Sequence, residues 1–168
     1  AATIAPPTLP TRSPAADLLP TATATPKPSP PPDAQTALKD KFTWAQDGLS
    51  DDEAEALQSL TSLILADPAL GQAVSDFYWV NDDITGDEKW ALRYLSQLHG
   101  REAKLGTLFA EIPWVADGIT EIEKRALQYI DGIHWATAVL GESISNLPWI
   151  QDGITGDEKW ALRHLKDI

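Results

Sequence analysis

Residues 114–123 read WVADGITEIE, and this stretch recurs in variant form along the chain. The four copies begin at Trp44, Trp79, Trp114 and Trp149. Neighbouring copies are 35 residues apart, and a fixed period of this size is typical of stacked repeat arrays. With the tryptophan as position 0, position 3 is Asp in every copy, and position 4 is Gly except for Asp83 in the second. Asp-Gly marks a turn, and Asp also adopts positive φ more readily than most residues. We therefore expect a turn after each tryptophan, with left-handed backbone at position 4.

Each copy continues into an amphipathic helix. Position 6 is Ser or Thr and position 9 is Glu, the pattern of a capping box, in which each side chain accepts a hydrogen bond from the other residue's backbone N–H. The four pairs are Ser50 and Glu53, Thr85 and Glu88, Thr120 and Glu123, and Thr155 and Glu158. Position 12 is Ala in every copy, and positions 16 and 19 are Leu or Ile. These three positions share one helical face, which predicts a first helix in each repeat with its apolar stripe buried.

A second, less regular helix is expected in each repeat. Asp67 followed by Pro68 is typical of a helix start, and Pro113 and Pro148 separate the later second helices from the next tryptophan. The predicted second helices span residues 68–77, 101–112 and 142–147. The glycines expected at helix ends are Gly100, Gly132 and Gly141.

The sequence thus predicts an all-α fold, a helical-repeat solenoid of two-helix, 35-residue repeats over residues 34–168. In period and outline this repeat resembles tetratricopeptide arrays. The Trp-x-x-Asp-Gly turn before each first helix is not part of that family's residue pattern. The resemblance therefore implies an architecture and no function.

The two ends of the array carry complementary half repeats. Residues 34–42 match a second helix without its first helix, and the last copy reaches Ile168 at the end of its first helix. A solenoid buries each repeat on its neighbour, so we expect Leu38 and Phe42 of one copy to meet Leu165 and Ile168 of another. Such a head-to-tail contact gives a ring if it closes and a filament if it does not. The alternative is that each half repeat caps a monomer.

Residues 1–33 form a tail rich in Pro, Thr and Ala, with ten of the thirteen Pro of the chain and charges that sum to zero. This composition predicts an extended, polyproline-like segment, either a flexible spacer or an O-glycosylated stalk. The candidate O-glycosylation sites are Thr8, Thr11, Thr21, Thr23, Thr25 and Ser29. The sequence begins at Ala1 and has no Met, so we expect a removed signal peptide and an extracellular or cell-surface protein.

Composition argues against several partner classes. The formal net charge of −12 lies wholly in residues 34–168, and phosphate binding needs clustered Lys and Arg. We therefore expect no nucleic-acid partner. No apolar run is long enough to span a membrane, and the chain has no Cys for a disulfide or a thiolate metal site.

Two candidate metal arrangements are weak. The Asp-Gly-x-Thr-x-x-Glu segment does not fit an EF-hand loop, because aligning its Gly leaves apolar residues at two ligand positions; the richest acidic cluster is at residues 81–83 and 87–88. His99 and His134 share position 20, where packing between helices is a simpler interpretation than a metal pair. We expect no metal and no cofactor.

An aromatic face is the remaining candidate site. Trp90 and Trp160 share position 11, where the other copies carry Glu55 and Arg125. A position that accepts such charges is expected to be exposed, and an exposed Trp serves as a sugar platform or a protein contact. The candidate face comprises Trp90, Trp160, Tyr94 and Tyr129.

Two functions fit these features. The first is an exported, acidic structural protein that self-assembles head to tail into a filament or ring, its tail docked on a neighbour or O-glycosylated. The second is a monomeric binding module of the cell envelope, held on a Pro-rich stalk, that recognises a glycan or peptide through the aromatic face. No motif predicts catalysis, and we expect no enzyme.

Overall fold

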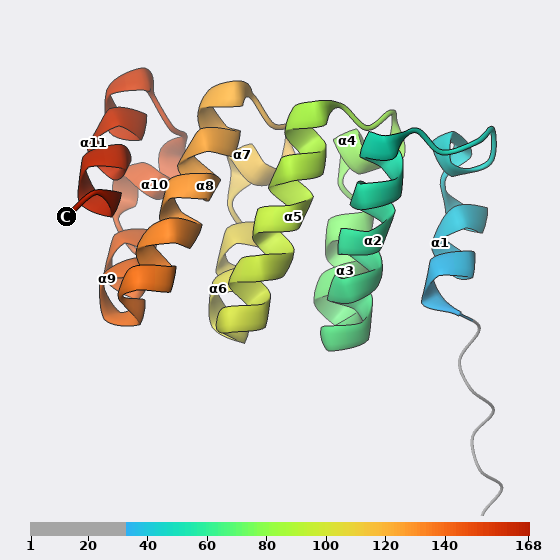
Figure 1. Ribbon diagram of the computed structural model, residues 1–168, viewed down its shortest axis with the longest axis horizontal. Helices are drawn as coiled ribbons and strands as arrows, with labels where there is room; N and C mark the ends of the chain where they lie inside the picture. The colour runs from blue at the N-terminus through green and yellow to red at the C-terminus, as the bar shows by residue number, and fades with distance from the viewer. Residues whose placement is uncertain (1–32) are drawn as a thin grey trace, which may run out of the picture.

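A computed structural model describes residues 33–168, and every regular element in that range is a helix. The predicted tail, apart from Asp33, and its candidate O-glycosylation sites lie outside the described residues. The helices pack in chain order from α1 at one end to α11 at the other (Figure 1). The elements are α1 (Ala34–Lys41), η1 (Thr43–Ala45), α2 (Asp51–Ala66), α3 (Pro68–Ser75), α4 (Tyr78–Asn81), α5 (Gly86–Arg101), α6 (Ala103–Ala110), α7 (Pro113–Ala116), α8 (Glu121–Ala136), α9 (Ala138–Ser145), α10 (Pro148–Asp152) and α11 (Gly156–Lys166).

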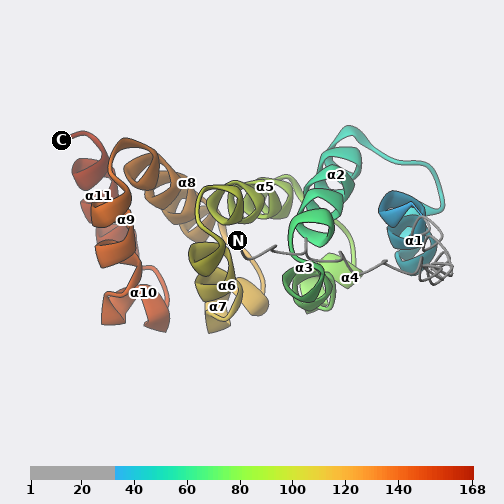
Figure 2. The same cartoon turned by 90° about the horizontal axis from the view of Figure 1, so that it is seen from below.

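The helices form two rows. The long-helix row consists of α2, α5, α8 and α11, each packed on the next, and the short-helix row consists of α3, α6 and α9. Each short helix packs on the long helix that precedes it, and α1 packs on α2. Figure 2 shows the two rows one above the other. The described part is therefore an all-α structure whose contacts are mostly between neighbours in sequence.

The predicted capping boxes are present at the start of all four long helices. In each box the Glu carboxylate accepts from the cap residue's N–H at 2.6–2.8 Å. The predicted stripe is buried in α2, α5 and α8. Its members there, with at most 2% exposure, are Ala56, Leu60, Leu63, Ala91, Leu95, Leu98, Ala126, Ile130 and Ile133.

The predicted bounds of the second helices were only partly right. The helix expected over 101–112 is α6, which begins at Ala103, and the helix expected over 142–147 is α9, which begins at Ala138. The break comes at Glu102 and at Thr137, whose φ values of −150° and −153° are extended. Neither residue is a strong turn former, so little in the local sequence predicts these breaks.

The expectation of a glycine at a helix end holds for Gly100, the last residue but one of α5, and was wrong for Gly132 and Gly141, which lie inside α8 and α9. Gly141 instead belongs to a series at position 27 of the repeat. The series is Gly71, Gly106 and Gly141. A Cβ built on these residues would come within 2.4–2.8 Å of atoms of Ile64, His99 and His134 on the preceding long helix. Only glycine permits this close crossing of short and long helices.

The tryptophans lie in short helices, η1, α4, α7 and α10, which come just before the predicted turn. Left-handed backbone follows at Gly48, Gly118 and Gly153, with φ of 106°, 128° and 115°. The same expectation for Asp83 was wrong, since no residue other than glycine has positive φ between residues 33 and 168. Instead, the side-chain carboxylate of Asp83 accepts a hydrogen bond from the backbone N–H of Ile84 at 2.9 Å. This alternative avoids the steric cost of placing a Cβ in the left-handed region.

Candidate functional site

A ladder of tryptophan hydrogen bonds links successive repeats. The indole Nε1 of Trp44 donates to the carbonyl of Val80, that of Trp79 to Val115, and that of Trp114 to Ile150, at 2.8, 2.8 and 2.7 Å. All three bonds are buried and join residues 36 apart. A buried indole N–H needs a partner, so this bond sets the register between repeats. Trp149 has no corresponding carbonyl ahead of it within residues 33–168.

A second ladder joins the N-terminal turns of the long helices. Lys89 Nζ donates to Asp52 at 2.7 Å, and Lys124 pairs with Asp87 in the same way. The hydrogen bond to Asp52 raises the pKa of Lys89 above its ordinary value. Each pair joins position 8 of one repeat to position 10 of the next. The pattern within a single repeat therefore did not predict the ladder, which is seen only when neighbouring repeats are aligned. Asp157 is the next carboxylate in this series and has no lysine partner among the described residues.

The helices α5 and α11 begin with the same sequence but have different surroundings. Residues 84–93 and 154–163 are identical. In α5 the outer stripe of Ala91, Leu95 and Leu98 is covered by α8 and has at most 1% exposure. In α11 Ala161 is exposed and Leu165 is half-buried, while Ile168 is fully exposed. The face of α11 that corresponds to a helix contact in α5 is therefore not covered by any of residues 33–168.

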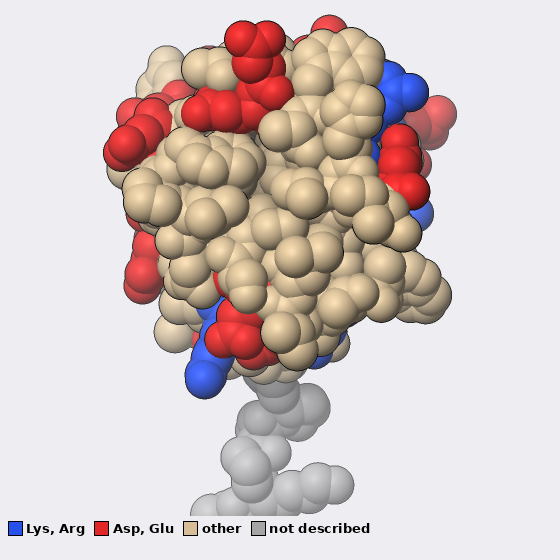
Figure 3. All heavy atoms as spheres, turned by 90° about the vertical axis from the view of Figure 1, so that its left-hand side faces the viewer, with Lys and Arg blue, Asp and Glu red and all other residues tan. Residues whose placement is uncertain are grey.

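The short-helix row is open at the same end. Leu140 of α9 is 39% exposed, whereas its counterparts Leu70 and Leu105 are 6% and 2% exposed. We define the open end as Leu140, Trp149, Ala161, Leu165 and Ile168. Figure 3 looks directly at this end of the molecule and shows a broad uncharged area with carboxylates mainly at its edge. An apolar area rimmed by polar groups is typical of a protein contact.

The other end differs in character. Leu38 and Phe42, which we expected to contact a neighbour, are 3% and 1% exposed in the protein's own interior. The ring of Phe42 stacks on Trp44 with centroids 5.0 Å apart. We define the polar end as the residues that line a shallow hollow of about 290 Å³ beside α1 and α2, namely Gln35, Ala54, Gln58, Thr61 and Ser62.

The predicted aromatic face lies along the long-helix row, but its rings are not equally available. Tyr94 is 9% exposed, Trp90 and Tyr129 are half-buried, and Trp160 is 49% exposed. Trp90 stacks on Tyr94, with centroids 5.9 Å apart, and the guanidinium of Arg93 lies 4.8 Å from the centroid of the Trp90 ring. The side chains of the protein itself thus occupy much of the Trp90 ring surface.

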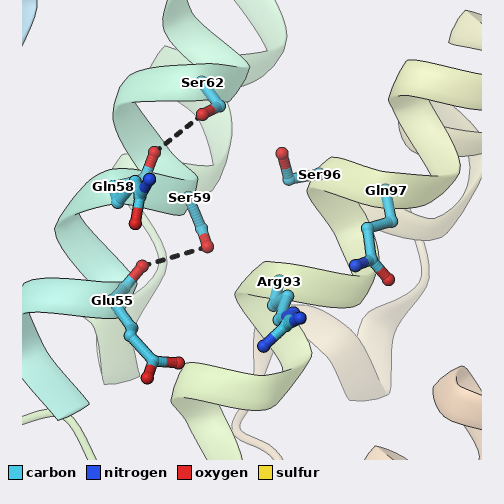
Figure 4. A pocket seen from close by; sticks show the side chains of 7 residues that line it. All are labelled: Glu55, Gln58, Ser59, Ser62, Arg93, Ser96 and Gln97. Carbon is cyan, nitrogen blue, oxygen red and sulfur yellow. Dashed lines mark hydrogen bonds between the residues drawn. The ribbon is translucent and has the colours of Figure 1, made fainter.

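Two hollows open between helices of the long-helix row. The larger, about 420 Å³, lies between α2 and α5 and is lined only by polar side chains (Figure 4). Its lining residues are Glu55, Gln58, Ser59, Ser62, Arg93, Ser96 and Gln97. The smaller, about 230 Å³, lies between α5 and α8. Its lining residues are Trp90, Tyr94, Lys124, Arg125 and Gln128.

The two expected inter-helix histidines are buried beside the short helices. His134 Nε2 lies 3.3 Å from the carboxylate of Glu102, and His99 Nδ1 is buried with no hydrogen-bond partner within residues 33–168. Over this range no three His, Cys, Asp or Glu side chains converge as a metal site would require. No helix of the described part is both long and apolar enough to cross a membrane.

No protein family, curated protein or solved structure matches this chain. The features that bear on function are therefore the open end, the polar end and the two hollows.

Proposed function

We propose that the 168-residue chain is a non-enzymatic structural protein, a helical-repeat solenoid that associates head to tail. In this proposal the open end of one copy receives α1 and α2 of the next. The single observation that supports it most is the contrast between α5 and α11, which begin with one sequence while only α5 has its outer stripe covered.

The repeat geometry suggests a register for the contact. If α1 of a second copy takes the place of a short helix beside α11, its α2 follows as the next long helix. Trp149 Nε1 then faces the carbonyl of Ala45 in that copy, because Ala45 corresponds to Val80, Val115 and Ile150 in the repeat. The tryptophan ladder would continue across the join with one more hydrogen bond.

In this register the residues of the second copy that form the contact differ from those expected from the sequence. Since Leu38 and Phe42 are buried inside their own copy, the second copy would offer the outer side of α1 and α2, including Ala54 and Thr61. These side chains are small and uncharged, so they do not oppose burial of Leu165 and Ile168. The proposed contact therefore has an apolar side on the open end and a largely polar, uncharged side on its partner.

The first test is the mass of the full chain in solution, measured by light scattering over a range of concentrations and accompanied by electron microscopy. We expect the mass to rise with concentration. Leu165→Glu should leave a monomer because it buries an unpaired carboxylate at the join. Tyr78→Ser is the matched control, since Tyr78 is 76% exposed on α4, outside both ends. A monomer at all concentrations would refute the proposal.

A gain of affinity tests the register itself. Ala54 occupies position 10, where Lys89 and Lys124 form the lysine ladder. Ala54→Lys should therefore pair with Asp157 of the preceding copy and strengthen association by about two- to fivefold, the effect of an exposed ion pair. Asp157→Asn should remove that gain. A contact between two open ends would not respond to Ala54→Lys at all.

Export, an extracellular location and a role for the tail stay predictions. Mass spectrometry of the protein from its natural source would detect hexose-type additions on Thr and Ser of residues 1–33 if the tail is O-glycosylated.

A second candidate function, a monomeric binding module for a peptide or glycan, is favoured by the hollows on the long-helix row. A ligand would have to protect residues of α5 and α8 from solvent in hydrogen exchange, while mutations at the open end leave its affinity unchanged.

A further inference from the structure

We infer that the hollow between α5 and α8 binds the carboxylate of an acidic side chain in a peptide segment. This inference rests on the second candidate function and is independent of head-to-tail association. The site consists of the Tyr94 hydroxyl, the Arg125 guanidinium and the Trp90 wall.

The Tyr94 hydroxyl is the first observation. Tyr94 is 9% exposed and lines the hollow, yet its hydroxyl forms no hydrogen bond with any of residues 33–168. Its oxygen is still reached by solvent, because the only fully enclosed side-chain atom without a partner in this range is His99 Nδ1. Burial raises the pKa of Tyr94, so the hydroxyl keeps its proton and remains a donor at neutral pH. A donor in this position needs an acceptor from a ligand or water.

The cations around the hollow are the second observation. Lys124 is already paired with Asp87. Arg125 is exposed, donates a long 3.4 Å hydrogen bond to Gln128 and forms a 3.8 Å ion pair with Glu121 one turn earlier in α8. Arg93 lines the neighbouring hollow between α2 and α5, lies across the Trp90 ring and forms no ion pair within the described part of the chain. Two cations, Lys124 and Arg125, thus line the hollow on a protein whose formal net charge is −12.

An oxyanion satisfies these groups together. A carboxylate can accept from the Tyr94 O–H on one oxygen and from Arg125 on the other, and such charge-assisted bonds are the stronger class. A sugar stacked on Trp90 is less favoured, because Arg93 and Tyr94 already lie against that ring. The neighbouring hollow adds amides at Gln58 and Gln97, which can pair with an extended peptide backbone. Recognition of acidic motifs by arginine clusters is a known mode of peptide binding.

The chain contains its own control. Trp160 and Arg163 repeat the Trp90 and Arg93 pair, with the guanidinium 4.9 Å from the indole ring. His164 stands where α5 has Tyr94, and no long helix beyond α11 closes a hollow there among the described residues. Diffuse attraction to arginine would act at both places, whereas the proposed site exists only between α5 and α8.

The test is an NMR titration of the full chain with an acetylated, amidated peptide of four glutamates, read at the indole N–H of Trp90 and the Nε–H of Arg125. We expect saturable shifts that the corresponding glutamine peptide does not cause. Tyr94→Phe and Arg125→Gln should each weaken binding by about tenfold or more, as expected for loss of one charged hydrogen bond. Arg163→Gln should leave the affinity unchanged.

Three outcomes would overturn the inference. They are no saturable shift with the glutamate peptide, equal losses for Arg125→Gln and Arg163→Gln, or tighter binding of glucuronate or inorganic phosphate than of the peptide. The last outcome would keep an anion site but reject a peptide as its ligand. A ligand found by hydrogen exchange elsewhere on the long-helix row would keep the second candidate function while rejecting this hollow.

Discussion

The helices α5 and α11 share the ten residues 84–93 and 154–163, which include the two residues before each helix, yet the two helices differ in how much of their surface is buried. Both begin with a complete capping box, so the start of the helix is decided by local sequence. The burial of the outer stripe is decided by the next long helix, which covers α5 and is not present beside α11 within residues 33–168. Each repeat thus specifies the start of its own long helix, while its neighbour supplies the burial.

The largest expected effect is the loss of stability when a side chain of the buried apolar stripe is truncated. Leu95→Ala in α5 removes a side chain with 1% exposure and should lower the free energy of unfolding by about 2–5 kcal/mol. Leu165→Ala at the same position of α11 should lower it by less than about 1 kcal/mol, because a half-exposed side chain leaves no closed cavity. Urea denaturation at dilute protein concentration measures both. Equal losses would mean that α11 is covered in solution even when the protein is dilute.

The tryptophan ladder should show the same asymmetry at a smaller scale. Trp79→Phe keeps an aromatic ring but leaves the buried carbonyl of Val115 without its donor, which should cost about 1–3 kcal/mol. Trp149→Phe removes no hydrogen bond within residues 33–168 and should cost clearly less in a dilute sample. In a concentrated sample Trp149→Phe should weaken association if Ala45 of a second copy accepts its hydrogen bond. Thermal unfolding at two concentrations distinguishes these effects.

The features predicted correctly from sequence are the ones that depend on few, local residues. A capping box needs only Thr155 and Glu158, for example, and all four boxes formed as expected. The helix crossing at Gly106 was not predicted, because the lack of room for a Cβ beside His99, which would come within 2.4 Å, is a property of two packed helices. The prediction for Asp83 was wrong for a related reason, since its side chain had a second way to complete the turn.

The candidate site shows the same division. The shared position of Trp90 and Trp160 indicated exposure, yet stacking on Tyr94 and Arg93 left Trp90 half-buried. In the sequence, Arg125 indicates only an exposed position, and it becomes part of the hollow because α8 lies beside α5. The residue pattern along one helix does not determine how closely the next helix packs against it.

The lysine ladder offers a pH-dependent test of the contacts between long helices. Lys89→Met removes the ion pair with Asp52 and should lower stability by up to about 1 kcal/mol at neutral pH. Because the pKa of Lys89 is raised in the folded protein, its contribution is complete below its unfolded value of about 10.4 and disappears as the pH rises through the folded pKa. The difference between wild type and variant in urea should therefore vanish in strongly alkaline solution. A difference that persists there would come from packing of the side chain rather than from its charge.

The smallest expected effect is the gain in stability from adding the lysine–carboxylate pair that is missing between α8 and α11. Ile122 occupies position 8, where Asp52 and Asp87 pair with a lysine of the next repeat, so Lys159 has no carboxylate in the corresponding place. Ile122 is 36% exposed, and Ile122→Asp should raise stability by about 0.5 kcal/mol through a new pair with Lys159. An Asp in the first turn of α8 also interacts with the helix dipole, so the gain alone is ambiguous. The double-mutant cycle with Lys159→Met separates the two contributions. A coupling energy near zero would mean that α8 and α11 do not repeat the register of α5 and α8, and there would then be no reason to extend this register to a second copy.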